Sequence, residues 1–335
     1  MAKFTIVLTS YNLDKYIGTA IQSVVDQTFQ DWQLIIVDDG STDKSLDIIK
    51  EYAEKDKRIL PLAHYKNWGC PIAVKNGIAK VRTELFGQLD ADDALREDAI
   101  EIAIEEHEKN PDVGFMYSGQ VLCDINLNPA TSVHATNRPL GKGYSFIDTP
   151  MGQWRTFKLS FWAKTLGVDT SMTYAEDLDM IYKMEEVGGV KMIDRNLYYV
   201  RMRDDSICRA PLTANLGRIS RAVAKLKAIC RRAGFAGEYQ WGVGDDKISQ
   251  EIMRMINDPV FPIHRTDFDL LAGLVNETVR RGKTGIEVRD GYNPLAIATL
   301  IDWTKLFDEL EIKLPEPRET ADEFIRKNMK PPQII

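Results

Sequence analysis

Three carboxylates fall within four residues of the chain, at Asp90, Asp92 and Asp93. They follow the run 84–89, which its residue pattern predicts to be a buried strand. Like charges gathered at one place are costly unless a cation or hydrogen-bond donors compensate them. Carboxylate oxygens at a strand end suit a hard divalent metal, with a phosphate completing its coordination. Acidic loops are usually just solvated, so the chemistry of this cluster depends on what the chain places beside it.

Two further acidic pairs occupy positions that favour chemistry. Asp38-Asp39 follows the apolar run 33–37, and Glu176-Asp177 stands at the start of a predicted helix. A helix N-terminus stabilises an ionised carboxylate, as a general base requires. Each pair also has a structural interpretation. Asp38 can hydrogen-bond the turn that follows it, and Glu176-Asp177 can cap its helix.

The elements that must position these residues alternate between strand and helix in the first half of the chain. Strands are predicted at 4–8, 33–37, 59–62, 85–89 and 113–117, and helices at 16–27, 41–55, 71–81 and 96–110. This order predicts an α/β fold whose mostly parallel central sheet is covered by helices on both faces. Ligands bind at the carboxyl ends of the strands in such sheets. We therefore expect the Asp38-Asp39 pair and the 90–93 cluster to share one edge.

The pattern is less regular beyond residue 117. Further strands are predicted at 120–125, 190–193 and 197–201, and helices at 160–166 and 176–187. The polar segment 137–149, rich in Gly and Pro, is predicted to be a mobile loop over the site. The character changes to helix only after residue 208. The expected domains are an α/β domain at 1–208, an all-α C-terminal domain at 209–313 and a Pro-containing arm at 314–335.

Two sets of side chains are open to more than one interpretation. Basic residues on the predicted helix 215–233 are expected to form a solvated face, with a contact to an acidic acceptor as the alternative. Trp154 and Trp162 could stack on a sugar or pack in the core.

Composition and charge exclude several classes of protein. The chain is 44% hydrophobic and 28% charged with a net charge of -7, which makes nucleic acid an unlikely partner because phosphate binding usually leaves a basic footprint. No apolar run approaches the roughly 20 residues of a membrane span, and no leader pattern opens the sequence. The four cysteines have no CxxC spacing, so free thiols and a cytoplasmic location are expected.

The strand-end segments, taken together, resemble those of the family 2 glycosyltransferases, which have a GT-A fold. The matching segments are Thr9-Ser10-Tyr11-Asn12, Val37-Asp38-Asp39-Gly40-Ser41-Thr42-Asp43, Asn67-Trp68-Gly69, Leu89-Asp90-Ala91-Asp92-Asp93 and Glu176-Asp177. The resemblance covers about residues 3–208. It implies that the domain at 1–208 is a GT-A catalytic domain that binds a nucleotide-sugar, with a UDP-sugar favoured.

The resemblance also implies roles for individual residues. Asp39 would accept a hydrogen bond from a uracil N–H, Asp90 would face the ribose, and Asp92 would hold a divalent metal, Mn²⁺ or Mg²⁺, that bridges the diphosphate. Lys75 stands where the family often has Arg, which keeps the charge but loses the bidentate fork. The whole set implied to bind the donor is Thr9, Tyr11, Asn12, Asp39, Asn67, Lys75, Asp90, Ala91 and Arg203.

The catalytic pair implied by the resemblance is Glu176-Asp177, with Asp177 as the general base. The acceptor hydroxyl loses its proton as it attacks the anomeric carbon, so one direct displacement with a separate base inverts that carbon. The hydroxyl acceptor, whether a glycan, a lipid-linked sugar or a protein, is not specified by the sequence. A non-catalytic module that binds a nucleotide or glycan is the alternative to an enzyme.

The chain departs from the family pattern in two places. Arg203 occupies a position where many members have a His that contacts the metal or diphosphate, and Arg binds phosphate oxygens but does not ligate metals. The Gln-x-x-Arg-Trp motif of processive members is missing after Glu176-Asp177, and Gln153-Trp154-Arg155 lies before that pair and does not match it. We therefore expect one sugar to be transferred per encounter. The C-terminal helices could serve as an acceptor platform, a docking surface or a homo-oligomer contact.

Overall fold

The computed structural model of the chain describes residues 2–133, 152–172, 174–204 and 211–232, together with 272, 273, 275, 276, 278–282 and 298. The predicted loop 137–149, most of the predicted C-terminal helices and the arm 314–335 lie outside these residues. In the part of the chain that the structure describes, no helix combines the length and apolar character needed to cross a bilayer.

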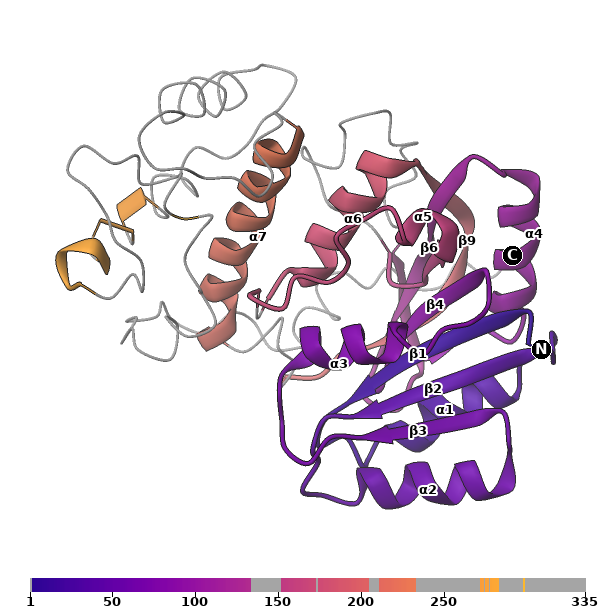
Figure 1. Cartoon of the computed structure of the whole chain (residues 1–335). Helices are drawn as coiled ribbons and strands as arrows, with labels where there is room; N and C mark the ends of the chain where they lie inside the picture. The colour runs from indigo at the N-terminus through magenta and orange to yellow at the C-terminus, as the bar shows by residue number, and fades with distance from the viewer. Residues whose placement is uncertain are drawn as a thin grey trace.

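The described elements alternate between strand and helix from residue 4 to residue 123, except that strand β5 directly follows strand β4 (Figure 1). The strands are β1 (Phe4–Ser10), β2 (Trp32–Asp38), β3 (Ile59–Ala63), β4 (Leu85–Asp90), β5 (Ala94–Leu95), β6 (Val113–Cys123), β7 (Pro129–Val133), β8 (Arg155–Lys158) and β9 (Gly189–Arg201). The helices are α1 (Ile17–Val25), α2 (Ser45–Lys55), α3 (Cys70–Ile78), α4 (Ala99–Lys109), α5 (Leu159–Trp162), α6 (Glu176–Val187) and α7 (Pro211–Arg232).

The nine strands in the described part of the chain belong to one sheet, in the order β3-β2-β1-β4-β8-β6-β9-β5, with β7 paired to β6. The first strands pair in parallel, and their register sets Ser10 beside Asp38 and Thr9 beside Asp90. The ends of β1, β2 and β4 therefore meet at one edge of the sheet, as the sequence predicts. We call this the carboxyl edge.

Strand β8, in the middle of the sheet, runs opposite to both of its neighbours. β8 lies between β4 and β6 and is antiparallel to both. Because its direction is reversed, β8 begins near the carboxyl edge, and its first residue, Arg155, pairs with Gln88 close to the end of β4.

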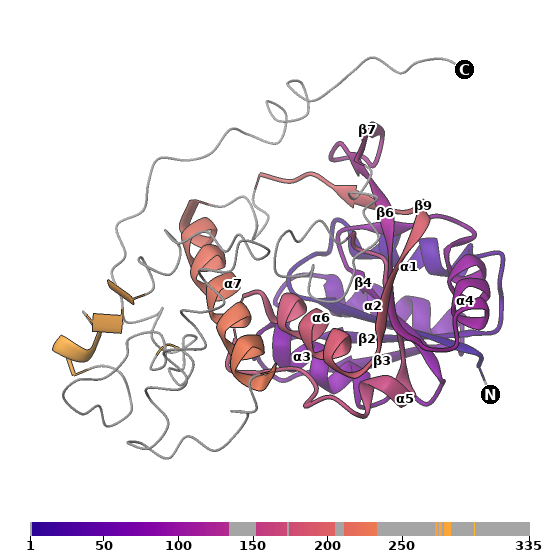
Figure 2. The same cartoon turned by 90° about the horizontal axis from the view of Figure 1, so that it is seen from above.

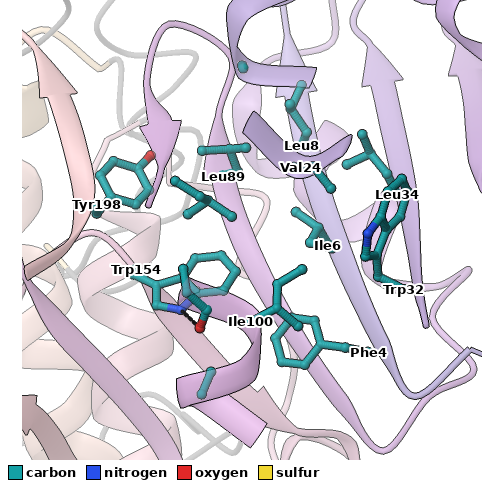
Figure 3. Close-up of a cluster of buried hydrophobic side chains, with 14 of the residues drawn as sticks. Phe4, Ile6, Leu8, Val24, Trp32, Leu34, Leu89, Ile100, Trp154 and Tyr198 are labelled. Atoms are coloured by element: carbon teal, nitrogen blue, oxygen red, sulfur yellow. Dashed lines mark hydrogen bonds between the residues drawn. The ribbon is translucent and has the colours of Figure 1, made fainter. Parts of the chain in front are cut away.

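The two faces of the sheet are covered by different helices, because alternate residues of each strand point to opposite sides. Phe4, Ile6 and Leu8 pack with residues of α1, α2 and α4, whereas Val7 packs with residues of α3 and α6. Figure 3 shows the first of these clusters, where Trp154 is fully buried and its indole N–H donates to the carbonyl of Ala99 at 3.2 Å.

The fit of α3 against β1 requires a glycine. A Cβ at Gly77 would stand 2.5 Å from Cγ1 of Val7, closer than van der Waals contact allows.

Trp162, like Trp154, is buried, and it lies in the second cluster. Both tryptophans are therefore core residues, and the acceptor-stacking interpretation is wrong for them.

Several predicted elements differ from the observed ones. The segments predicted as separate strands at 113–117 and 120–125 form the single strand β6, and those at 190–193 and 197–201 form the single strand β9. Their pairing is interrupted by register shifts around Ser118 and Gly119. The short strands β5, β7 and β8 were not predicted.

Helix α7 lies beside α6 in both views of the molecule (Figure 2). Arg231 Nη1 lies 2.9 Å from Oδ1 of the fully buried Asp179, and Arg231 Nε lies 2.8 Å from Oε2 of Glu186. Lys227 pairs with Asp169 at 2.7 Å. The expected solvated face is therefore wrong for Lys227 and Arg231, whose charges hold α7 against the α/β domain.

Candidate active site

The loops after β1 and β2 brace each other at the carboxyl edge. Asn12 adopts a positive φ of 52°, its N–H donates to Ser41 Oγ at 3.0 Å, and its Oδ1 accepts from the N–H of Thr42 at 2.8 Å. Asp38 accepts from the N–H of Ser41 at 3.0 Å, in agreement with its structural interpretation. The Asn12 side chain thus shapes the loop on which Tyr11 lies.

Asp39 is held in one orientation by three donors. Its Oδ1 accepts from the N–H of Trp68 at 3.0 Å and faces His64 Nδ1 at 2.7 Å, and its Oδ2 accepts from the N–H of Gly69 at 2.8 Å. Asn76 Nδ2 lies 3.0 Å from the other ring nitrogen of His64. With the Asn76 amide donating to Nε2, the ring proton lies on Nδ1 and faces Asp39.

Tyr198 joins two residues of the cluster, the backbone of Asp90 and the side chain of Asp93. Its hydroxyl accepts from the N–H of Asp90 at 3.0 Å and hydrogen-bonds Asp93. Asp93 is buried and also accepts from the N–H of Arg201 at 2.8 Å. Burial, followed by the charges of Asp92 and Asp90, raises the pKa of Asp93 well above its usual range. Asp93 is therefore a structural member of the cluster.

Asp90 retains an accessible surface although protein atoms surround it on most sides. Desolvation raises its pKa to about 6, and the charges of Asp92 and Asp177 add to this effect while Arg155 opposes it. A carboxyl group that titrates near neutral pH at the edge of a sheet is typical of a functional site.

Asp92 is paired with a cation. Oδ2 of Asp92 accepts from Arg203 Nε at 3.0 Å and lies 2.9 Å from Arg203 Nη2. The Arg201 guanidinium donates to the backbone oxygen of Asp92 at 2.7 Å, and both arginines lie over the ring of Tyr16, at 4.8 and 5.0 Å from its centroid. The site therefore already stabilises a positive charge against the Asp92 carboxylate.

The predicted base begins α6 and faces the cluster. Asp177 Oδ1 accepts from the N–H of Leu178 at 2.7 Å, and Oδ2 lies 2.9 Å from Arg155 Nη2. The side chain of Asp177 is 39% exposed, whereas that of Arg155 is 13% exposed. The Asp177 carboxylate is thus held by protein contacts on one side and is exposed on the other.

Glu176, the first residue of α6, has a raised pKa. Desolvation, and then the charge of Asp177, raises the pKa of Glu176 to about 8, so the carboxyl group carries a proton at neutral pH. The Cys70 thiol, at the start of α3, hydrogen-bonds both Glu176 and Thr9. Burial raises the pKa of the Cys70 thiol well above its usual range, so this group is a neutral thiol.

The remaining predicted residues lie on the same loops and helix. Tyr11 is 43% exposed, Lys75 is exposed on α3, and Asn67 accepts from the N–H of Gly69 at 2.9 Å. The Ala91 side chain is buried in the core, so any contact of this residue with a donor would come from its backbone.

Four residues of the site were not predicted: His64, Cys70, Arg155 and Tyr198. His64 lies in the loop after β3, and the other three belong to α3, β8 and β9; none has a sequence pattern of its own. The signal that could have pointed to Arg155 is the need for a cation near so many carboxylates.

The oxygen ligands at this edge of the sheet fit a divalent metal that is shared with a diphosphate. Asp92 offers a hard oxygen ligand, and Mg²⁺ is usually held by one or two carboxylates together with substrate phosphates. Among the described residues, no group of three or more His, Cys, Asp or Glu side chains is arranged to hold a metal by itself.

The first strands form a parallel unit that ends in an acidic loop. A mixed parallel and antiparallel extension follows it, together with a helix that begins with Glu-Asp. This arrangement is a GT-A architecture. Solved structures agree. TarS residues 1–349 of S. aureus in complex with UDP-GlcNAc aligns with a TM-score of 0.56 and 15% identity, over 98% of this chain and 92% of that one. The mannosyltransferase PcManGT of Pyrobaculum calidifontis, with GDP-Man and Mn²⁺, aligns with a TM-score of 0.52 and 13% identity, over 92% and 86%. These likenesses establish the fold.

Sequence comparison is more specific. Residues 5–149, less than half of the chain, match the model of glycosyl transferase family 2. Chondroitin synthase of Escherichia coli is 31% identical over 195 residues, which are 58% of this chain and 28% of that protein. Hyaluronan synthase of Pasteurella multocida is 28% identical over 203 residues, 58% of this chain and 20% of that protein. The chain therefore matches less than a third of the length of these relatives.

Proposed function

We propose that the chain is an inverting glycosyltransferase that moves one sugar per encounter from a UDP-sugar to a hydroxyl acceptor. The observation that carries this proposal is that Asp177 lies near Asp90 at one edge of the sheet, where each acts on the charge of Arg155. A base and a diphosphate site on opposite sides of a bound sugar are what a direct displacement needs. UDP-GlcNAc in one structural neighbour, and GDP-Man with Mn²⁺ in another, support a nucleotide-sugar donor and a divalent metal.

Donor binding is assigned to the carboxyl edge. Asp39, which is fixed by Trp68, Gly69 and His64, would accept from a uracil N–H. Asp90 would face the ribose. Asp92 would hold a divalent metal together with the diphosphate, and the metal would stabilise the charge that develops on the leaving group. Arg203, which pairs with Asp92, would bind phosphate oxygens of the diphosphate.

Proton transfer is assigned to Asp177. The O–H bond of the acceptor breaks, its proton passes to the Asp177 carboxylate, and the oxygen forms a bond to the anomeric carbon. The bond from that carbon to the diphosphate breaks, and its electron pair leaves with the nucleoside diphosphate. Glu176 is protonated at neutral pH and therefore cannot accept this proton, which favours Asp177 as the base.

The test is turnover of a panel of nucleotide-sugars in the presence of Mn²⁺ or Mg²⁺, measured as released nucleoside diphosphate. We expect a UDP-sugar to be consumed and Asp92→Ala to lose this activity. Asp177→Asn is expected to bind the donor with unchanged affinity and to lose transfer by 100-fold or more, about the range of general base catalysis.

Three outcomes would contradict parts of this proposal. If no nucleotide-sugar binds, the chain is not a sugar transferase of this kind. If donors bind without turnover under all conditions, the chain is a non-catalytic binding module. If Asp177→Asn retains activity, the base is another group, and Glu176 becomes the next candidate.

A further inference from the structure

Arg155 occupies the centre of the candidate site although nothing in its sequence context resembles a catalytic motif. β8 enters the sheet antiparallel between β4 and β6, so its first residue lies at the edge where β4 ends. The Arg155 side chain is mostly buried there and extends to Asp177 on α6, with 2.9 Å between Nη2 and Oδ2. The fold therefore brings a cation from a strand to the start of a helix that lies more than twenty residues later in the chain.

The surroundings of Arg155 are dominated by acidic groups. Asp177 and Asp90 act on it most strongly, followed by Tyr198 and Glu176, and together they raise its pKa in spite of burial. Its Nε is buried and has no hydrogen-bond partner among the described residues. The guanidinium is therefore held chiefly by the charges around it, and it balances carboxylates from both β4 and α6.

The contact has a specific consequence for Asp177. One oxygen of this carboxylate accepts from the Leu178 N–H, and the other faces Arg155. A carboxylate with both oxygens engaged in this way has a defined plane, and its remaining lone pairs point in defined directions. A catalytic group must be held close to its productive geometry, because a displacement of about 1 Å can cost 100-fold in rate.

We propose that Arg155 is the positioning residue for the general base: it fixes the orientation of the Asp177 carboxylate and compensates the negative charge of Asp90 beside it. This inference rests on the proposed function of Asp177. It assigns to Arg155 an effect on the rate of transfer rather than on the affinity for the donor.

The test compares Arg155→Ala and Arg155→Lys with the wild type, using the UDP-sugar that the wild type consumes. We expect Arg155→Ala to lower kcat by about 100-fold while the KM for the donor and the Kd for UDP change by less than about threefold. Lysine keeps the positive charge but lacks the planar, bidentate guanidinium group, so it should recover part of the rate. Free guanidinium chloride at millimolar concentration should raise the turnover of Arg155→Ala saturably and leave the wild type unchanged.

A matched control is available in Arg58→Met. Arg58 pairs with Asp56 at 2.7 Å, next to the start of β3 and so at the opposite edge of the sheet. Its loss removes the same charge and the same kind of ion pair, and it should leave kcat unchanged.

Several results would overturn the inference. Turnover of Arg155→Ala within threefold of the wild type would do so, as would a loss of UDP affinity equal to the loss of kcat, because the latter makes Arg155 a donor ligand. Absence of rescue by both guanidinium and lysine would also overturn it, since the loss would then be one of general structure.

A crystallographic measurement separates this inference from the proposed function. In Arg155→Ala, the Asp177 side chain should lose its single orientation, whether or not a UDP-sugar is consumed. A retained orientation refutes the positioning role, whereas a wild type that turns over no nucleotide-sugar refutes the proposed function instead.

Discussion

Three arginines contact different acidic residues of the candidate site. Arg155 faces Asp177, Arg203 faces Asp92, and the Arg201 backbone N–H binds Asp93. Desolvation and neighbouring carboxylates both favour the protonated form of an acid, and together they raise the pKa of Glu176. The side chains of Arg155 and Arg203 therefore compensate part of the negative charge gathered at this edge of the sheet.

The pairing of Arg203 with Asp92 leads to a prediction about metal binding. A divalent cation and the guanidinium compete for the same carboxylate, so Arg203→Met should bind Mn²⁺ more tightly than the wild type in the absence of nucleotide, by roughly tenfold. The same variant should bind UDP more weakly in the presence of a chelator, because it lacks a phosphate-binding cation. Titration calorimetry measures both affinities, and Arg58→Met is the control. An Mn²⁺ affinity that is unchanged or lower in Arg203→Met would contradict the competition.

The sequence predicted the carboxylates of the site better than their partners. Asp39, Asp90 and Asp92 directly follow strands, and a parallel sheet brings strand ends together whatever its other details. Arg155 reaches the site only because β8 is reversed, and His64 reaches it only because the loop after β3 folds back onto Asp39. Such contacts depend on tertiary structure and have no local pattern.

At the scale of elements, the junction of α6 with α7 links the predicted base to the helical part of the chain. Asp179, two residues after Asp177, is fully buried and lies 2.6 Å from Lys183 Nζ as well as 2.9 Å from Arg231 Nη1. Arg231 also faces Glu186 through a second nitrogen. The basic residues of α7 therefore contribute to the structure of α6.

This junction predicts a loss of stability on removal of one cation. Arg231→Met leaves the buried Asp179 with a single positive partner, so the free energy of unfolding should fall by about 3 kcal/mol. Arg221→Met is the control, because Arg221 is exposed on the same helix and its loss should change stability by less than about 0.5 kcal/mol. Chemical denaturation followed by circular dichroism measures the difference. Equal stability of the two variants would show that α7 does not depend on this ion pair.

The elements that the sequence predicted correctly are those with a clear period. The helix at 176–187 was predicted within its observed bounds, and the strands of the parallel unit were predicted to within a few residues. β5 and β8 have two and four residues, too few for a period, and the residues of β8 are Arg155, Thr156, Phe157 and Lys158. They form strands because neighbouring strands pair with them, which a local pattern does not reveal.

At the scale of the whole molecule, a buried histidine connects helix α4 to strand β8 inside the α/β domain. His107, near the end of α4, is 1% exposed, and its Nε2 lies 2.9 Å from Thr156 Oγ1 on β8. Burial, with a contribution from the charge of Lys158, lowers the pKa of His107 to about 4. The folded protein therefore keeps this ring neutral at a pH where the unfolded chain protonates it.

The sign of the effect on stability follows from linkage. Above pH 6.5 the ring is neutral in both states and contributes no pH dependence. Between pH 6.5 and about 4 the unfolded chain binds a proton that the folded protein does not, so the free energy of unfolding falls as the pH falls. The loss attributable to this one group should be about 2.5 kcal/mol at pH 4.5.

His107→Gln keeps an N–H donor near Thr156 but has no ionisable group, so it should lose less stability than the wild type between pH 7 and pH 4.5. Urea denaturation of both proteins at the two pH values measures this difference. Equal losses would show that other groups, such as the ion-paired carboxylates of the α6–α7 junction, set the acid limit of the fold.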